Sequence, residues 1–186
     1  MDIREEVLTK VGRNVVCFQK MEAMLKFLNS LQSMNGSAED PQNDAEAGNR
    51  RRRQQNRKPM GPLADEFLRS AYSPSQTEPA TPATHDIKVS TSFRIEADAV
   101  LVAERKKALR SVVRERNQLI HKWLAAFDPN SDESCAALVT ALDEQYDRIL
   151  PEFGALRALL STIREHVDYL QSADFSRALR QQIEGK

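Results

Sequence analysis

The chain has 186 residues, of which 40% are hydrophobic and 29% charged, and its formal net charge is zero. This length suits one domain with a real hydrophobic core. Because positive and negative charges balance, the molecule as a whole has no positive electrostatic potential that would bind nucleic acid or an anionic membrane. Such binding would require a local patch of positive charge. The apolar runs are only a few residues long and the start "MDIREEVLTK" lacks a signal-peptide core, so no membrane contact and a cytoplasmic location are expected.

The first half of the chain alternates between helical patterns and polar stretches. Residues 3–32 carry apolar side chains at three- and four-residue spacing, which predicts an amphipathic helix. Residues 33–59 offer little to bury and predict a flexible linker that ends in the basic run Arg50–Arg53. Residues 60–72 predict a short docking helix. A second flexible linker, rich in Pro, Ser and Thr, is predicted over about 73–92, and the alternating pattern at its end has no evident strand partner.

The second half is helical throughout. Three patterns follow one another, over about residues 96–127, 132–150 and 152–171. Pro129 ends the first, Ser131 or Asp132 can cap the second, and Pro151 is expected to kink or break the helix before the third. A final turn or short helix is predicted near the C-terminus. The prediction is a single all-α domain over residues 1–186, a bundle of about four long helices with short satellites.

The two cysteines, Cys17 and Cys135, each fall within a predicted helix. Neither belongs to a CxxC pair or has a histidine nearby in sequence, so both are expected to be buried thiols. No Cys/His array or carboxylate cluster in the sequence suggests a metal site, and no cofactor is expected.

The segment "RNQLIH", residues 116–121, interrupts the apolar stripe of the 96–127 helix. At about 100° per residue, Arg116 falls in the middle of that stripe, and Asn117 and His121 lie together at its edge. The stripe is formed by Leu109, Val112, Val113, Leu119, Ile120, Trp123, Leu124 and Phe127. An arginine there is costly unless it is paired or faces a wet cleft. One interpretation pairs Arg116 with a core carboxylate, such as Glu22 of the first helix, and leaves His121 as an ordinary boundary histidine.

The other interpretation comes from a resemblance. Arg116, Asn117 and His121 match the R-[N/D/H]-x3-H motif of the HEPN superfamily, all-α proteins many of which are metal-independent endoribonucleases. "VRERNQLIHKWLAAFD" resembles the motif helix of bacterial HEPN-like proteins. The segments "VGRNVVCFQKMEAMLKFL" and "MGPLADEFL" are also similar to these proteins, so the resemblance covers most of the chain outside the linkers.

The resemblance implies a homodimer with two motif copies facing one cleft, which forms the active site at the dimer interface. It assigns His121 to proton transfer, Arg116 to the charge on the phosphate in the transition state, and Asn117 to orienting His121 or a phosphate oxygen. The cleaved substrate would be RNA, attacked by its own 2′-OH. Arg114 and Arg110, close to the same line of the helix, are candidate helpers for phosphate contact, although a solvated arginine is the commoner role.

Asn14 lies in the apolar sector of the first helix. It either lines the cleft or is a satisfied core amide. The leading hypothesis is a ribonuclease toxin or defence effector, with an antitoxin or other regulatory partner left open. HEPN toxins that are inactivated by nucleotide transfer carry a Tyr two residues after the motif His, and Trp123 stands there instead. The alternatives are a catalytically silent HEPN-like dimer that binds RNA or protein, and a purely structural helical dimer.

Overall fold

The computed structural model describes residues 2–31, 34–37, 41–72, 88–91 and 93–170, together with 172–175, 177 and 181. Its elements are the helices α1 (Ile3–Leu31), α2 (Pro41–Arg57), α3 (Met60–Ala71), α4 (Ala99–Gln118), α5 (Leu124–Ala126) and α6 (Asp132–Leu170), the π-helical turn η1 (Leu119–Trp123), and the short strands β1 (Met34–Ser37) and β2 (Lys88–Thr91). The fold class is all-α, as predicted, and the helices predicted over 3–32 and 60–72 are confirmed as α1 and α3.

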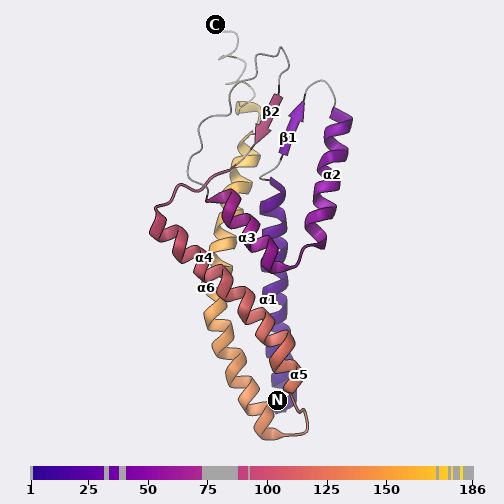
Figure 1. Cartoon of the computed structure of the whole chain (residues 1–186), viewed down its shortest axis with the longest axis vertical. Helices are drawn as coiled ribbons and strands as arrows, with labels where there is room; N and C mark the ends of the chain where they lie inside the picture. Colours follow the sequence, from indigo (N-terminus) through magenta and orange to yellow (C-terminus); the bar gives the residue numbers. More distant parts are fainter. Residues whose placement is uncertain are drawn as a thin grey trace.

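Two long helices form the spine of the molecule (Figure 1). α1 and α6 start at the same end and run side by side in the same direction, while α4 runs back across them and α3 packs against α1 and α4. Apolar side chains from all four helices fill the space between them, among them Met21, Leu25, Phe67, Leu109 and Leu142. Cys17 and Cys135 are buried free thiols in this core, as predicted. The core therefore fixes one face of α4 and leaves the other to solvent.

Pro151 lies inside α6, which continues unbroken from Asp132 to Leu170. The two helices predicted on either side of it are therefore one, and the expected break is wrong. A proline in a helix removes one backbone hydrogen bond and costs about 3 kcal/mol. Pro151 is exposed, so water can satisfy the carbonyl that loses its partner, and burial of Ile149 and Leu156 on either side holds the helix to the core. At the start of α6, the Ser131 hydroxyl accepts from the backbone N–H of Ser134 at 3.1 Å, which confirms the predicted cap.

The predicted linker over 33–59 needs correction, because α2 occupies Pro41–Arg57 and includes Arg50–Arg53. Pro41 is the first helical residue, a position that suits proline, and the buried Gln55 donates to Glu66 of α3 at 2.8 Å. The apolar pattern missed α2 because α2 is almost entirely polar. β1, also in this stretch, pairs antiparallel with β2 in the register Met34↔Thr91 to Ser37↔Lys88, so the alternating segment has a strand partner after all.

The rest of the second predicted linker, 73–87 and 92, lies outside the described residues, as does most of the segment predicted to form a final turn. Among the helices that the structure describes, none is both long enough and apolar enough to cross a bilayer.

Candidate active site

The motif residues lie where α4 passes into η1. The apolar stripe of the sequence forms as predicted: Leu109, Val112 and Leu119 are buried, and Val113, Ile120, Trp123, Leu124 and Phe127 pack against the core with part of each side chain exposed. The opposite face is polar and open, with Arg110, Arg114, Asn117 and His121 all exposed. Four of the predicted site residues thus share one solvent face of one stretch of helix.

Arg116 sits at the boundary between these two faces. It is half-buried rather than central in the core, and its Nη1 donates to Oδ1 of Asn117 at 3.1 Å. The predicted burial of Arg116 is therefore overstated. The alternative pairing with Glu22 is not formed, since Glu22 binds Lys26 at 2.7 Å. The neighbouring Asn117 instead holds one edge of the guanidinium and leaves its other donors available.

The π turn changes how His121 is presented. Leu124 N–H donates to Leu119 O across five residues, and the backbone N–H of Leu119 donates to both Arg116 O and Glu115 O. A π turn holds one residue more than an α turn, so side chains beyond it lag behind their positions on a straight helix. On an uninterrupted α-helix, residues five apart point about 140° away from each other. The π turn departs from this constant angle, and His121, which lies within it, has an exposed side chain.

Glu115, next to the motif arginine, points inwards and was not singled out by the sequence. Its side chain is 13% exposed, and its carboxylate accepts from Arg148 Nε at 2.8 Å and from Gln145 Nε2 at 3.2 Å. Gln145 Nε2 also donates to the backbone oxygen of Glu115 at 2.9 Å. The hydrogen bond to Glu115 raises the pKa of the Arg148 guanidinium. These contacts tie the last α turn before η1 to α6.

Asn14 extends the same network to α1. Fully buried, it donates from Nδ2 to Leu142 O at 2.8 Å and to Gln145 Oε1 at 3.1 Å, and its Oδ1 accepts from Arg13 Nε at 3.1 Å. Its polar atoms are therefore occupied inside the protein. Of the two roles left open by the sequence, Asn14 has that of a core amide and does not line the site with His121.

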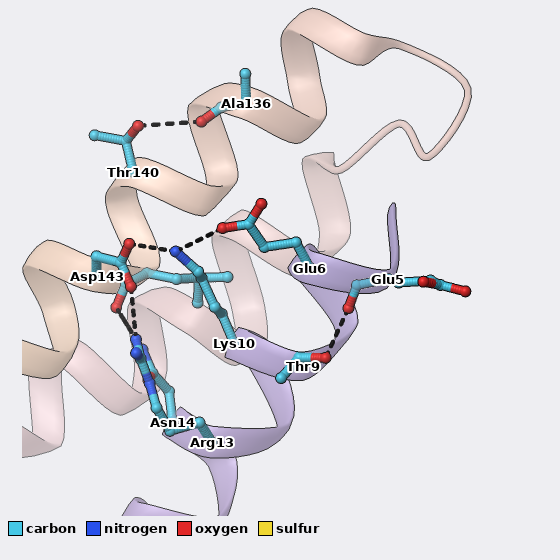
Figure 2. A network of polar contacts seen from close by, with 10 residues as sticks. Glu5, Glu6, Thr9, Lys10, Arg13, Asn14, Ala136, Thr140 and Asp143 are labelled. Carbon is cyan, nitrogen blue, oxygen red and sulfur yellow. Dashed lines mark hydrogen bonds and ion pairs between the residues drawn. The ribbon is translucent and has the colours of Figure 1, made fainter. Parts of the chain in front are cut away.

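The outer end of the network is an ion-pair cluster between α1 and α6 (Figure 2). Lys10 and Arg13 both point at Asp143, with Arg13 Nη2 at 3.0 Å from Oδ1, and Lys10 also binds Glu6 at 2.9 Å. The hydrogen bond from Lys10, with that from Arg13, holds the pKa of Asp143 below its usual value. The charged side chains of this cluster are thus paired with one another and join α1 to α6.

The two helper arginines differ in their contacts. Arg110 lies 3.5 Å from Asp65 of α3, both side chains being more than half exposed, so water screens the pair. Arg114 is exposed one turn before Asn117 and has no ion-pair partner among the described residues. Both side chains are exposed on the same face as Asn117 and His121. Within the described part of the chain, no group of three His, Cys, Asp or Glu side chains is arranged to hold a metal ion.

Comparisons with known proteins add no relative. No protein-family model matches the chain, no curated protein matches it significantly, and no solved structure does so either. The resemblance to the HEPN superfamily therefore rests on the motif residues and the flanking segments of the sequence.

Proposed function

We propose that the protein is a metal-independent endoribonuclease of HEPN type. One observation carries the proposal: Arg116, Asn117 and His121 reach solvent together at the α4–η1 junction, with the guanidinium held by Asn117. A polar group of this composition on an otherwise well-packed helix fits a site for a phosphodiester. The buried contacts of Glu115 support it, because they fix the backbone that carries the three side chains.

The chemistry follows from these residue types. The 2′-OH of RNA loses its proton and its oxygen attacks the adjacent phosphorus, while the bond to the 5′-oxygen of the next nucleotide breaks and that oxygen takes up a proton. Histidine can accept or donate a proton near neutral pH, which suits His121 to either transfer. The permanently charged guanidinium of Arg116 stabilises the extra negative charge on the phosphate oxygens in the transition state. The products are a 2′,3′-cyclic phosphate and a 5′-OH.

The reaction moves two protons, and each chain supplies one histidine at this site. A homodimer that places two copies of the motif across one cleft would provide both the acid and the base. The apolar side chains beside the motif, such as Trp123 and Leu124, are only partly covered within one chain and support packing of a second copy here. The proposed biological role is a toxin or defence effector acting in the cytoplasm, restrained by an antitoxin or other regulatory partner.

The test is incubation of the purified full chain with total cellular RNA in excess EDTA. Wild type is expected to cut the RNA, His121→Ala to leave it intact, and the control His166→Ala to behave as wild type. His166 is suited to this control because it is exposed on α6, away from the motif helix. Intact RNA with wild type would overturn the proposed nuclease. RNA binding that survives in His121→Ala without any cleavage by wild type would support the catalytically silent alternative.

A further inference from the structure

A groove with a basic rim runs between α1 and α6 and encloses about 590 Å³. On α6 it is lined by Phe153, Arg157, Leu160 and Arg164. The side of α6 that meets α3 and α4 carries different residues, among them Glu152, which pairs with Arg105 of α4 at 2.8 Å. The groove therefore lies on another face of the α1–α6 pair and is distinct from the motif.

The rim has a single sign of charge. Lys20 from α1 and Arg157 and Arg164 from α6 line the groove, and among the described residues no carboxylate does. None of the three forms an ion pair with a carboxylate in the described part of the chain. Three unpaired cations around one groove favour an anionic occupant. They also disfavour a second copy seated through the same face, because like charges would then meet.

The floor of the groove is apolar. Phe27, Phe153 and Leu160 line it, and the ring of Phe27 remains 40% exposed with the Arg164 guanidinium 6.0 Å from its centroid. Exposed Val16 and Leu150 continue the same helical stripes beyond the groove, four residues before Lys20 and three before Phe153. Two parallel rows of apolar side chains with cations beside them match the arrangement that receives an amphipathic helix.

We propose that this groove binds an acidic amphipathic helix of a partner protein. The apolar face of that helix would bury Phe27 and Leu160, and its Asp or Glu residues would pair with Lys20, Arg157 and Arg164. Single-stranded RNA fits less well. Apart from the three cations, none of the described side chains that line the groove is suited to hydrogen-bond a base. Arg164 also lies over the ring of Phe27, where a base would stack. This proposal does not depend on the proposed nuclease.

A displayed library of random helix-forming peptides, selected on the full chain, tests the proposal. Selected sequences are expected to place apolar residues at i, i+3 or i+4 and i+7, with acidic residues on the flanks. Their affinity, measured by fluorescence polarisation, should fall about tenfold or more in a variant carrying Arg157→Glu and Arg164→Glu, and should weaken with added salt. A control with Lys106→Glu and Lys107→Glu makes the same change of charge at exposed positions on α4 and should bind like wild type.

Removal of apolar surface provides a second arm. Phe27→Ala should weaken binding of the selected peptides, while Leu8→Ala should not, because Leu8 is 69% exposed on α1 outside the groove. Failure to select acidic amphipathic sequences, or equal binding to wild type and the Arg157/Arg164 variant, would overturn the proposal. Two further results would also overturn the proposal. In the first, a groove variant loses binding of a labelled oligouridine but keeps its affinity for the peptides. In the second, it loses self-association, measured by sedimentation, and again keeps that affinity.

Discussion

The polar groups on the two faces of the motif helix differ in their exposure and in their hydrogen bonding. On the inner face, Glu115 has 13% of its side chain exposed, and its carboxylate is used by Arg148 and Gln145, with Asn14 completing the chain of hydrogen bonds to α1. On the outer face, His121 is exposed. Arg116, at the boundary of the two faces, donates one hydrogen bond to a side chain among the described residues, that of Asn117. In the same turn of helix, the inward-facing polar groups are hydrogen-bonded within the protein, whereas the outward-facing ones can bind a ligand.

This difference separates structural from chemical roles. A buried polar group must be fully satisfied, because an unpaired one costs about 1–3 kcal/mol. The inner network meets this demand and leaves little for a ligand to bind. Exposed groups carry no such requirement, so a histidine and an arginine kept together on the outer face are free to bind and react. Substitutions on the two faces should therefore have different effects.

The largest expected effect is on the outer face. Arg116→Ala should lower RNA cleavage by about a hundredfold or more, because the transition state loses its fixed positive charge. The free energy of unfolding should change by less than about 0.5 kcal/mol, since the side chain is half-exposed. Cleavage rates and chemical denaturation measure the two quantities. Lys107→Ala, which removes an exposed charge elsewhere on α4, is the control, and equal rates for both variants would remove Arg116 from the mechanism.

The second-largest expected effect is on catalysis and comes from a substitution on the inner face. Gln145→Leu removes the donor to the Glu115 backbone oxygen, which lies one turn before η1. The catalytic groups should then be held less accurately, and kcat should fall by about tenfold to a hundredfold while KM changes little. Thr140→Val alters an exposed polar residue of the same helix and should leave kcat unchanged. A loss of stability without a change in kcat would show that Gln145 serves packing alone.

Two asparagines provide a matched pair for stability. Asn14→Ala removes the donor to the buried Gln145 Oε1 and to Leu142 O, so the free energy of unfolding should fall by about 2 kcal/mol. Asn117→Ala, on the exposed face, should change it by less than about 0.5 kcal/mol and should lower cleavage instead. Denaturant melts of both variants measure the difference. Equal losses of stability would contradict the contrast between the faces.

The smallest expected effect is on the pH dependence of stability. Hydrogen bonds from Lys10 and Arg13 lower the pKa of Asp143 in the folded protein. A lowered pKa stabilises the fold above the unfolded value of about 3.9, and this contribution is lost as the pH falls through the folded pKa. Asp143→Asn should therefore lower the melting temperature slightly at pH 6, and the difference from wild type should shrink as the pH falls below the unfolded value and through the folded pKa. A difference that stays constant over this range would contradict the pairing.

Apolar spacing was sufficient to predict the all-α class, the bounds of α1 and α3, and the buried stripe of α4. It failed where structure depends on polar contacts or on context. α2 is nearly all polar, so apolar spacing gives no signal for it, whereas Pro41 at its first position and the contact of Gln55 with Glu66 favour the helix. α6 passes through Pro151 because packing on both sides outweighs the lost hydrogen bond.

The site shows the same limit. A wheel with a constant angle per residue placed Arg116 in the core, whereas the structure places it at the edge and turns Glu115 inwards. The π turn at Leu119–Trp123 ends the constant angle, and no apolar pattern signals such a turn. Gln145 and Arg148 lie 30 and 33 positions from Glu115 along the chain, so only the fold brings them to the motif.

The most direct test of the central claim is the chemistry of the cleaved ends. RNA digested by the wild-type protein in EDTA should carry 2′,3′-cyclic phosphate and 5′-OH termini, detected by mass spectrometry of a short defined oligonucleotide. His121→Ala should give no such ends, and His166→Ala should give the wild-type pattern. Termini with a 5′-phosphate, or cleavage that persists in His121→Ala, would contradict the assignment of Arg116, Asn117 and His121 as the active site.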